Sequence, residues 1–211
     1  MDREAIRRAV EAERLDLADL LDRLAPADWD VGSLCAGWTV RDVVAHLALA
    51  TRLSRRAAVL GVLRARGDVN RMIHDAARRR AAEFGTAELV AQLRATAGSA
   101  QRPLGTQPPD QLVDLLVHGQ DIARPLGRVR PMPGEHVLPA LEHVWRSSFY
   151  GARRRFAGLR FVATDLDWSA GEGAEVRGPA GELLMVLTGR GAGLDGLDGP
   201  AAAEAAARLR S

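Results

Sequence analysis

Apolar residues recur at helical spacing through most of the first 124 residues of the chain. In residues 3 to 24 the apolar side chains alternate with charged ones in the way that is typical of an amphipathic helix. They are Ile6, Val10, Leu17, Leu20, Leu21 and Leu24. The same spacing predicts three further helices, over 39 to about 63, over 69 to 100 with a break at Gly85, and over 108 to about 124. Four long helices joined by modest loops predict an antiparallel bundle.

Residues that begin or end helices mark the boundaries of these segments. Thr39 and Asp42 form a Thr-x-x-Asp capping box, which predicts that the second helix begins there. Pro26 is expected to end the first helix, because proline cannot continue a helical hydrogen-bond pattern. Thr86 is the expected cap of the segment after the break, and Pro108 suits the first turn of the fourth helix.

The pattern changes in the C-terminal part of the chain. A fifth helix is predicted over 136 to about 155, after a stretch rich in Pro and Gly at 127 to 134. From Gly158 onward, apolar and polar residues alternate as they do in strands. This alternation predicts strands at 159–164 and 174–177, and helical spacing returns at 180–188 and 201–209.

These segments predict a mainly α protein with two domains. The helical bundle covers residues 1–126, and residues 127–157 form a connector with the fifth helix. Residues 158–211 form a small α/β C-terminal domain, because they combine short strands with short helices.

The composition favours a folded protein of the reducing cytoplasm. Hydrophobic residues make up 47% of the 211 residues, which is enough for a packed core. The N-terminal segment is charged and amphipathic rather than a secretory signal, and no apolar run is long enough to cross a bilayer. Cys35 is the one cysteine, so an internal disulfide is excluded. We therefore expect a cytoplasmic protein without a membrane partner.

The positive charge is spread too thinly to indicate a nucleic-acid partner. All 29 basic residues are Arg, and the formal net charge is only +2. Nucleic-acid binding usually needs a concentrated basic face, so the Arg runs at 78–80 and 153–155 are interpreted as solvated helix faces. The G-x-G-x-x-G sequence at 191–196 follows a predicted helix rather than a strand, and we reject it as a nucleotide site.

Two histidines and an aspartate form the strongest candidate site. Asp114 and His118 lie four residues apart on a predicted helix, so both side chains project from one face. His46 lies on another predicted helix, and its apolar neighbours place its ring near the core. A carboxylate, an imidazole one turn away and a second imidazole from a facing helix can hold a divalent metal with open coordination positions. A second interpretation stays open, in which each side chain makes only a local hydrogen bond.

Asp121 and Cys35 each allow more than one role. Asp121, one turn beyond His118, could be a fourth ligand or could orient His118 through its other ring nitrogen. Cys35 could be a nucleophile, but no activating group lies beside it in the sequence, so a structural thiol is favoured. His74 lies among polar residues and is interpreted as a surface residue.

Two of these segments resemble a known family. Residues 35–47, Cys-Ala-Gly-Trp-Thr-Val-Arg-Asp-Val-Val-Ala-His-Leu, and residues 114–121, Asp-Leu-Leu-Val-His-Gly-Gln-Asp, are similar to the mycothiol-dependent maleylpyruvate isomerase family. The similarity continues in residues 163–168, 176–180 and 187–190, so it covers nearly the whole chain. The resemblance implies a DinB-like four-helix bundle followed by a small α/β C-terminal domain.

The resemblance also implies a set of site residues and cofactors. A divalent metal, usually zinc, would be held by His46, Asp114 and His118, and mycothiol would be the thiol cosubstrate. The characterised isomerase of this family has a Glu where this chain has Asp114, which is one methylene shorter, so we expect weaker metal binding here. An arginine of the C-terminal domain is expected to reach the active site. Arg190, which ends the matching Leu-Thr-Gly-Arg segment, is the candidate catalytic residue.

The implied function is that of a metal-dependent enzyme that adds a thiol to a small-molecule electrophile. A zinc-bound thiol is deprotonated at neutral pH and stays nucleophilic. Elimination after addition gives an isomerase, whereas retention of the adduct gives an S-transferase, and both stay open. The alternative is a non-catalytic metal- or small-ligand-binding protein of the same fold. A homodimer is one option for its assembly.

Overall fold

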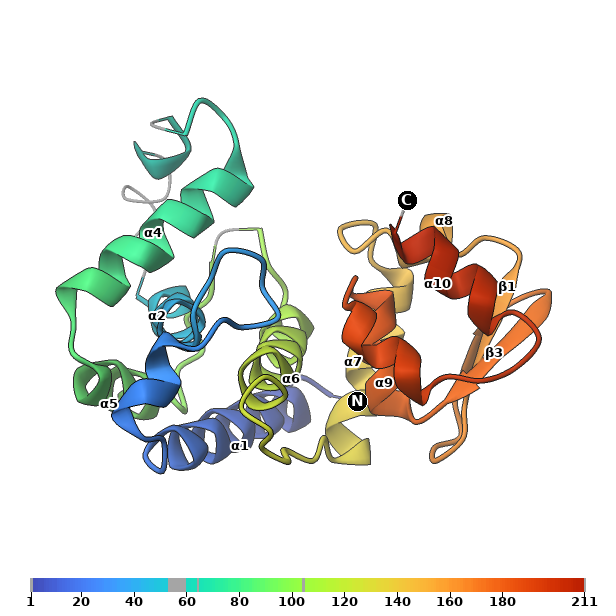
Figure 1. Ribbon diagram of the computed structural model, residues 1–211, viewed down its shortest axis with the longest axis horizontal. Coiled ribbons are helices and arrows are strands. Elements are labelled where there is room, and N and C mark those ends of the chain that lie inside the picture. The colour runs from blue at the N-terminus through green and yellow to red at the C-terminus, as the bar shows by residue number, and fades with distance from the viewer. Residues whose placement is uncertain (1, 53–59, 64, 104, 211) are drawn as a thin grey trace. The chain divides into compact units, whose positions relative to one another are not determined.

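The computed structural model of the chain describes residues 2–52, 60–63, 65–103 and 105–210 (Figure 1). Its internal contacts divide the chain into two compact units, Met1–Arg130 and Pro131–Ser211. Within the described ranges, no helix is both long and apolar enough to cross a membrane.

Every regular element of the N-terminal unit in the described residues is a helix. Its main helices are α1 (Arg3–Leu21), α2 (Val40–Ala50), α4 (Val69–Glu83), α5 (Thr86–Ala95) and α6 (Pro108–Ala123). Both α1 and α2 pack against α5 and α6, which gives the four-helix bundle, and α4 packs against α2 (Figure 1). A short 3-10 helix, η1 (Pro26–Asp30), precedes α2 and contacts it. The predicted bundle is therefore confirmed.

The core of this unit comes from the apolar faces that the spacing of residues predicts. Side chains from all four bundle helices are almost fully buried: Leu17, Leu21, Val43, Val44, Leu47, Leu89, Leu93, Leu112 and Leu116. Each such side chain stabilises the fold by about 1.5–3 kcal/mol relative to an exposed position. The helices that carry the candidate site residues are thus held in place by the core itself.

Two helix boundaries in this unit differ from the prediction. The second helix ends at Ala50 with a turn at Thr51 instead of continuing to about Leu63. Residues 53–59 of that expected helix lie outside the described residues, and residues 60–63 are helical. The cap of α5 is Gly85 rather than Thr86, because Glu88 Oε2 accepts the Gly85 backbone N–H at 2.8 Å.

The C-terminal unit combines helices with a small sheet. Its elements are α7 (Gly134–Arg146), α8 (Ala152–Arg155), β1 (Leu159–Ala163), β2 (Ser169–Gly171), β3 (Ala174–Gly178), α9 (Ala180–Leu187), η2 (Gly191–Gly196) and α10 (Ala202–Arg210). The strand order is β2-β1-β3, with β2 antiparallel and β3 parallel to β1. Helix α9 packs on β1 and β3, and α7 packs on α9. The mainly α fold class with a small α/β part is confirmed.

Two glycines make the sheet connection possible. The chain passes from β2 to β3 across the start of β1, and both glycines there have positive φ, 87° at Gly171 and 112° at Gly173. A Cβ at Gly171 would lie 2.1 Å from the Leu159 carbonyl oxygen, and one at Gly173 would lie 2.1 Å from that of Gly158. Only glycine fits this crossing.

The fifth helix is shorter than the apolar spacing predicts. Helix α7 ends at Arg146, where Ser147 is extended, and α8 begins only after Gly151, whose φ is 65°. Phe149, which continues the helical spacing of apolar residues in the sequence, lies in this break and is exposed. Strand β2 was not predicted, because three residues are too few for a detectable alternation.

Candidate metal centre

Hydrogen-bonded caps fix the start of the two helices that carry the candidate site residues. Thr39 Oγ1 accepts the Asp42 N–H at 3.3 Å, and Asp42 Oδ2 accepts the Thr39 N–H at 3.0 Å. The predicted capping box is therefore confirmed, and His46 follows one turn later on α2. At the start of α6, Asp110 Oδ2 accepts the backbone N–H of Gln107 at 2.7 Å. Both helices thus begin at a defined residue, which fixes the direction of the side chains one or two turns further on.

The structure brings His46, Asp114 and His118 to one point. Asp114 Oδ1 lies 3.3 Å from His118 Nε2, and Asp114 Oδ2 lies 3.5 Å from His46 Nε2. The two imidazole rings are 5.0 Å apart between centroids, and one ligand atom from each residue lies within 4.8 Å of the others. Two ligands on one tetrahedral zinc ion, with bonds of about 2.0–2.2 Å, are separated by about 3.3–3.6 Å. The donor atoms therefore have the chemistry and spacing that a divalent ion requires.

The three side chains form a strongly coupled group of charges. Burial raises the pKa of Asp114, but the imidazoles of His46 and His118 more than offset this and hold that pKa well below its usual range. Burial lowers the pKa of His118, but Asp114, Asp121 and Cys35 outweigh it and raise that pKa well above its usual value. Asp114 is therefore an anion at neutral pH and a ready ligand for a cation.

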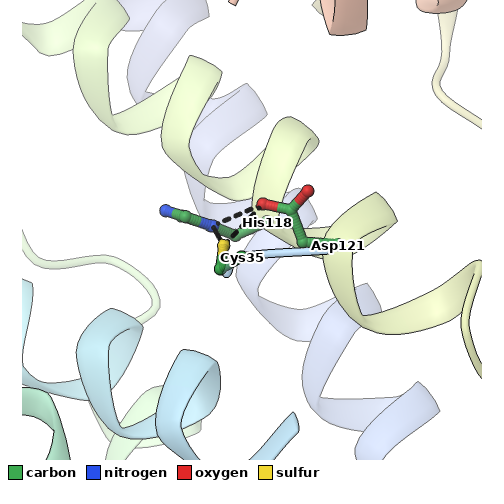
Figure 2. A group of neighbouring side chains, drawn as sticks. All are labelled: Cys35, His118 and Asp121. Atoms are coloured by element: carbon green, nitrogen blue, oxygen red, sulfur yellow. Dashed lines mark hydrogen bonds and ion pairs between the residues drawn. The ribbon is translucent and has the colours of Figure 1, made fainter. Parts of the chain in front are cut away.

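The opposite edge of the His118 ring meets a second group of side chains (Figure 2). Asp121 Oδ2 lies 2.8 Å from His118 Nδ1, and the Cys35 thiol donates to the same oxygen at 3.1 Å. Cys35 Sγ also lies 3.5 Å from His118 Nδ1. Of the two roles open to Asp121, this arrangement favours orientation of His118, since His46 and Asp114 face the other ring nitrogen.

Cys35 is the residue that local sequence reasoning missed. The sequence places no activating group beside it, whereas the fold places its thiol against His118 and Asp121. The Leu34 N–H donates to the Asp121 carbonyl oxygen at 3.1 Å, which holds the loop before α2 against α6. No pattern near Cys35 in the sequence indicates this contact, because the contact depends on how the loop closes.

An indole ring packs beside the histidines. The Trp38 ring centroid lies 5.4 Å from that of His46, 6.5 Å from that of His118 and 5.8 Å from that of His74. Trp38 is buried, so it excludes water from one side of the two candidate ligands. His74, which was expected at the surface, is only partly exposed and packs against this ring. An apolar wall of this kind lowers the local dielectric and strengthens the interaction of the donors with a cation.

Arg190 lies in the C-terminal unit, directly after the turn that ends α9. Its Nη1 donates to the Thr188 carbonyl oxygen at 2.9 Å, and its backbone N–H donates to the Met185 carbonyl oxygen at 2.8 Å. These contacts fix the Thr188–Arg190 turn. The catalytic role expected for Arg190 stays a prediction.

The fold and this site define a helical-bundle protein that presents two histidines and one carboxylate to a common point. The chain belongs to the family described as mycothiol maleylpyruvate isomerase N-terminal domain, whose model matches residues 10–132. The family resemblance inferred from residues 35–47 and 114–121 is thereby confirmed.

Two solved structures have a similar fold. One is the crystal structure of the mycothiol-dependent maleylpyruvate isomerase, with 15% identity, a TM-score of 0.61, and coverage of 96% of this chain and 94% of that chain. The other is a histidine-to-alanine mutant of that isomerase, with 16% identity, a TM-score of 0.58 and the same coverage. A comparison with curated protein sequences finds no match. At such low identity the two structures establish the fold of nearly the whole chain.

Proposed function

We propose that this chain is a metal-dependent enzyme that uses mycothiol to act on a small-molecule electrophile, either as an isomerase or as an S-transferase. The observation that carries the proposal is the convergence of His46, Asp114 and His118 within 4.8 Å. Membership of the mycothiol maleylpyruvate isomerase N-terminal domain family supports the choice of thiol.

The residues that would hold the metal are His46, Asp114 and His118. A zinc ion held there would supply a positive charge that keeps a thiol deprotonated and nucleophilic at neutral pH. Asp114 contributes one negative charge and the two imidazoles contribute none when neutral, so a site holding a divalent cation is positive overall. An anionic thiolate and an oxygen of the electrophile are therefore attracted to it.

The thiol chemistry accounts for both reaction types. The thiolate sulfur forms a bond to one carbon of an activated carbon–carbon double bond. The π electron pair of the double bond moves onto the activating carbonyl group. Rotation about the resulting single bond, followed by loss of the thiolate, restores the double bond in the other configuration. Protonation of the adduct at carbon instead gives a stable thioether, which is the product of a transferase.

Arg190 is proposed as a further group that binds an anionic substrate. Its position at the end of the segment Leu187–Arg190 supports this role, since that segment resembles the family. A guanidinium suits this task because it keeps its charge at every relevant pH and can bind a carboxylate through two hydrogen bonds. The Arg190→Ala variant should raise KM for an anionic electrophile more than for a neutral one.

The test uses purified protein, mycothiol and dimethyl maleate as the electrophile. After the protein is supplied with zinc, elemental analysis should find about one equivalent, and NMR should detect either dimethyl fumarate, the product of an isomerase, or the thioether, the product of a transferase. The His118→Ala variant should lose both the metal and turnover while its circular dichroism spectrum is retained. His136→Ala, which changes a histidine of the other unit, is the matched control and should keep both.

Three outcomes contradict the proposal in different ways. Metal without thiol turnover favours the alternative of a non-catalytic metal- or small-ligand-binding protein. Turnover without metal removes the metal from the mechanism. An unchanged metal content in the His118→Ala variant shows that this residue is not a ligand. Light scattering on the same preparation tests whether the protein is a homodimer.

A further inference from the structure

We propose that Asp121 is a positioning residue that holds His118 in the tautomer needed for metal binding, and that the Cys35 thiol supports this role. Asp121 would accept the Nδ1–H of His118, which leaves the Nε2 lone pair directed toward Asp114 and His46. The inference rests on the proposed metal-binding function, which it extends from the ligands to the residues around them.

Burial shows that the Asp121 carboxylate needs these partners. Its relative exposure is 0%, and it lies within α6 one turn beyond His118. A carboxylate withdrawn from water is costly unless hydrogen bonds compensate for the lost hydration. Oδ2 receives the Cys35 thiol at 3.1 Å and lies 2.8 Å from His118 Nδ1, so this one oxygen joins both side chains (Figure 2).

The distances exclude the alternative that Cys35, His118 and Asp121 hold an ion of their own in this arrangement. Each of these three residues offers one atom that can bind a metal, and the three atoms lie within 4.8 Å of one another. The separation of 2.8 Å between Asp121 Oδ2 and His118 Nδ1 is, however, a hydrogen-bond distance. Two ligands on one zinc ion would be about 3.3 Å apart or more. The group is therefore a hydrogen-bonded network behind a ligand.

The positions of the two nitrogens of the His118 ring determine which of them carries the proton and which can bind a metal. A neutral imidazole has one N–H and one lone pair, on different nitrogens. His118 presents Nδ1 to Asp121 and Nε2 to Asp114, which lies 3.3 Å away. Asp121 and Asp114 are both carboxylates that can only accept a hydrogen bond, but Asp121 lies 2.8 Å from Nδ1 whereas Asp114 lies 3.3 Å from Nε2. The shorter contact therefore favours the N–H of the neutral ring on Nδ1. The lone pair is then on the nitrogen that faces the other two candidate ligands.

Cys35 supports the positioning role of Asp121 by donating a hydrogen bond to the same carboxylate oxygen, Oδ2. The backbone hydrogen bond from the Leu34 N–H to the Asp121 carbonyl oxygen holds the loop that carries Cys35 against α6. The loop is therefore already in place when the thiol donates to the Asp121 carboxylate. A thiol is a weak hydrogen-bond donor. It restricts rotation of the Asp121 carboxylate, and the carboxylate keeps its negative charge for the interaction with His118. Removal of the thiol should therefore weaken metal binding less than removal of the Asp121 charge does.

The test is the Asp121→Asn variant, which keeps the size of the side chain but can donate a hydrogen bond to Nδ1. Nitrogen-15 NMR of the metal-free protein, at a pH where the ring is neutral, should show His118 protonated on Nδ1 in wild type and on Nε2 in the variant. Zinc titration should show affinity lowered by about 10- to 100-fold, as is typical when the partner of a ligating histidine is lost. Glu83→Gln, which removes an exposed carboxylate at the end of α4, is the control and should change neither.

Cys35 variants supply a second measurement that does not remove the buried carboxylate. Cys35→Ala should weaken zinc binding by a few-fold, in line with the modest worth of one neutral hydrogen bond, and should shift the His118 Nδ1 resonance. Cys35→Ser, which retains a donor, should restore both.

The outcomes separate this proposal from the proposed function. An unchanged tautomer in Asp121→Asn, or an unchanged zinc affinity in a wild type that binds zinc, overturns the positioning role. If Asp121→Asn does not fold, a His118 Nδ1 resonance that stays unchanged in Cys35→Ala overturns the proposed network. If wild type binds no zinc but the tautomer changes in Asp121→Asn, the metal function fails and the control of the His118 tautomer by Asp121 stands.

Discussion

The carboxylate of Asp114 faces the imidazole of His46 across 3.5 Å between Oδ2 and Nε2, although the two residues lie on different helices. Its other oxygen lies 3.3 Å from His118 Nε2. An aspartate therefore reaches both histidines here, even though its side chain is one methylene shorter than a glutamate. The strength with which this shorter carboxylate holds a metal is open to direct measurement.

We predict that Asp114→Glu strengthens zinc binding. The Asp114 side chain is partly exposed rather than enclosed on all sides, and a carboxylate longer by one methylene can extend further toward an ion between the two imidazoles. A tenfold gain corresponds to about 1.4 kcal/mol and is the expected order of the effect in calorimetric titration. Asp19→Glu, which lengthens an exposed carboxylate on α1, serves as the control. Tight binding by wild type and weaker binding by the Glu variant would show that the aspartate is the fitted ligand.

Zinc binding should strengthen as pH rises. Because the pKa of His118 is raised, the metal-free ring keeps its second proton to a higher pH than an ordinary imidazole does, and a metal ion must displace that proton. Asp114 has a lowered pKa and releases no proton in this range. Below the pKa of His118 the apparent affinity should therefore rise about tenfold per pH unit. Calorimetry in buffers of different ionisation enthalpy counts the released protons, and a count of zero at neutral pH would contradict this prediction.

Gly119→Ala should destabilise the N-terminal unit. A Cβ at Gly119 would lie 2.6 Å from Arg130 Nη1. The Arg130 side chain is 1% exposed and forms an ion pair with Glu13, so it cannot swing away freely. Overpacking of this kind costs about 1–3 kcal/mol. Urea unfolding measures the loss of free energy of unfolding.

The control for this substitution is Gly32→Ala. A Cβ at Gly32 meets no atom within 4 Å, and Gly32 is not among the glycines with positive φ. Its free energy of unfolding should therefore stay close to that of wild type. Equal stability of both variants would show that Arg130 repacks at little cost.

Limited proteolysis should cleave the chain between its two units. Arg128 lies in an exposed stretch, the Val129 after it is 89% exposed, and the units divide between Arg130 and Pro131. Trypsin should therefore cut early after Arg128, and mass spectrometry should detect a fragment that begins at Val129. Cleavage after Arg14, which is buried, should come much later. If the Val129 fragment never accumulates, the proposed organisation into residues 1–126, 127–157 and 158–211 loses its support.

The features that depend on short-range pattern could be predicted from the sequence. Leu17 and Leu21 lie on the predicted apolar face of α1, and Thr39 and Asp42 form the predicted cap of α2. The pairing of Asp114 with His118 follows from their spacing of four residues on one helix. These features could be predicted because each one is decided by neighbours within about one turn.

The features that depend on tertiary packing could not be predicted in this way. The break at Ser147 interrupts an apolar pattern that would otherwise continue a helix. Strand β2 exists because Gly171 lets the chain pass close to Leu159. The contact between Cys35 and His118 depends on a loop that a backbone hydrogen bond closes onto α6. No local signal marks such contacts, because their partners are distant in the sequence.

The capping box at Thr39 has a consequence for the length of the segment between it and His46. An α-helix turns by about 100° per residue, so one residue inserted into this segment would rotate the imidazole to a different side of α2. A deletion would rotate it by the same angle in the opposite sense. The number of residues between Thr39 and His46 therefore sets the direction in which the His46 ring points. Residue types in this segment can change more freely than its length. Insertions placed before the cap would leave the angular setting of His46 unchanged.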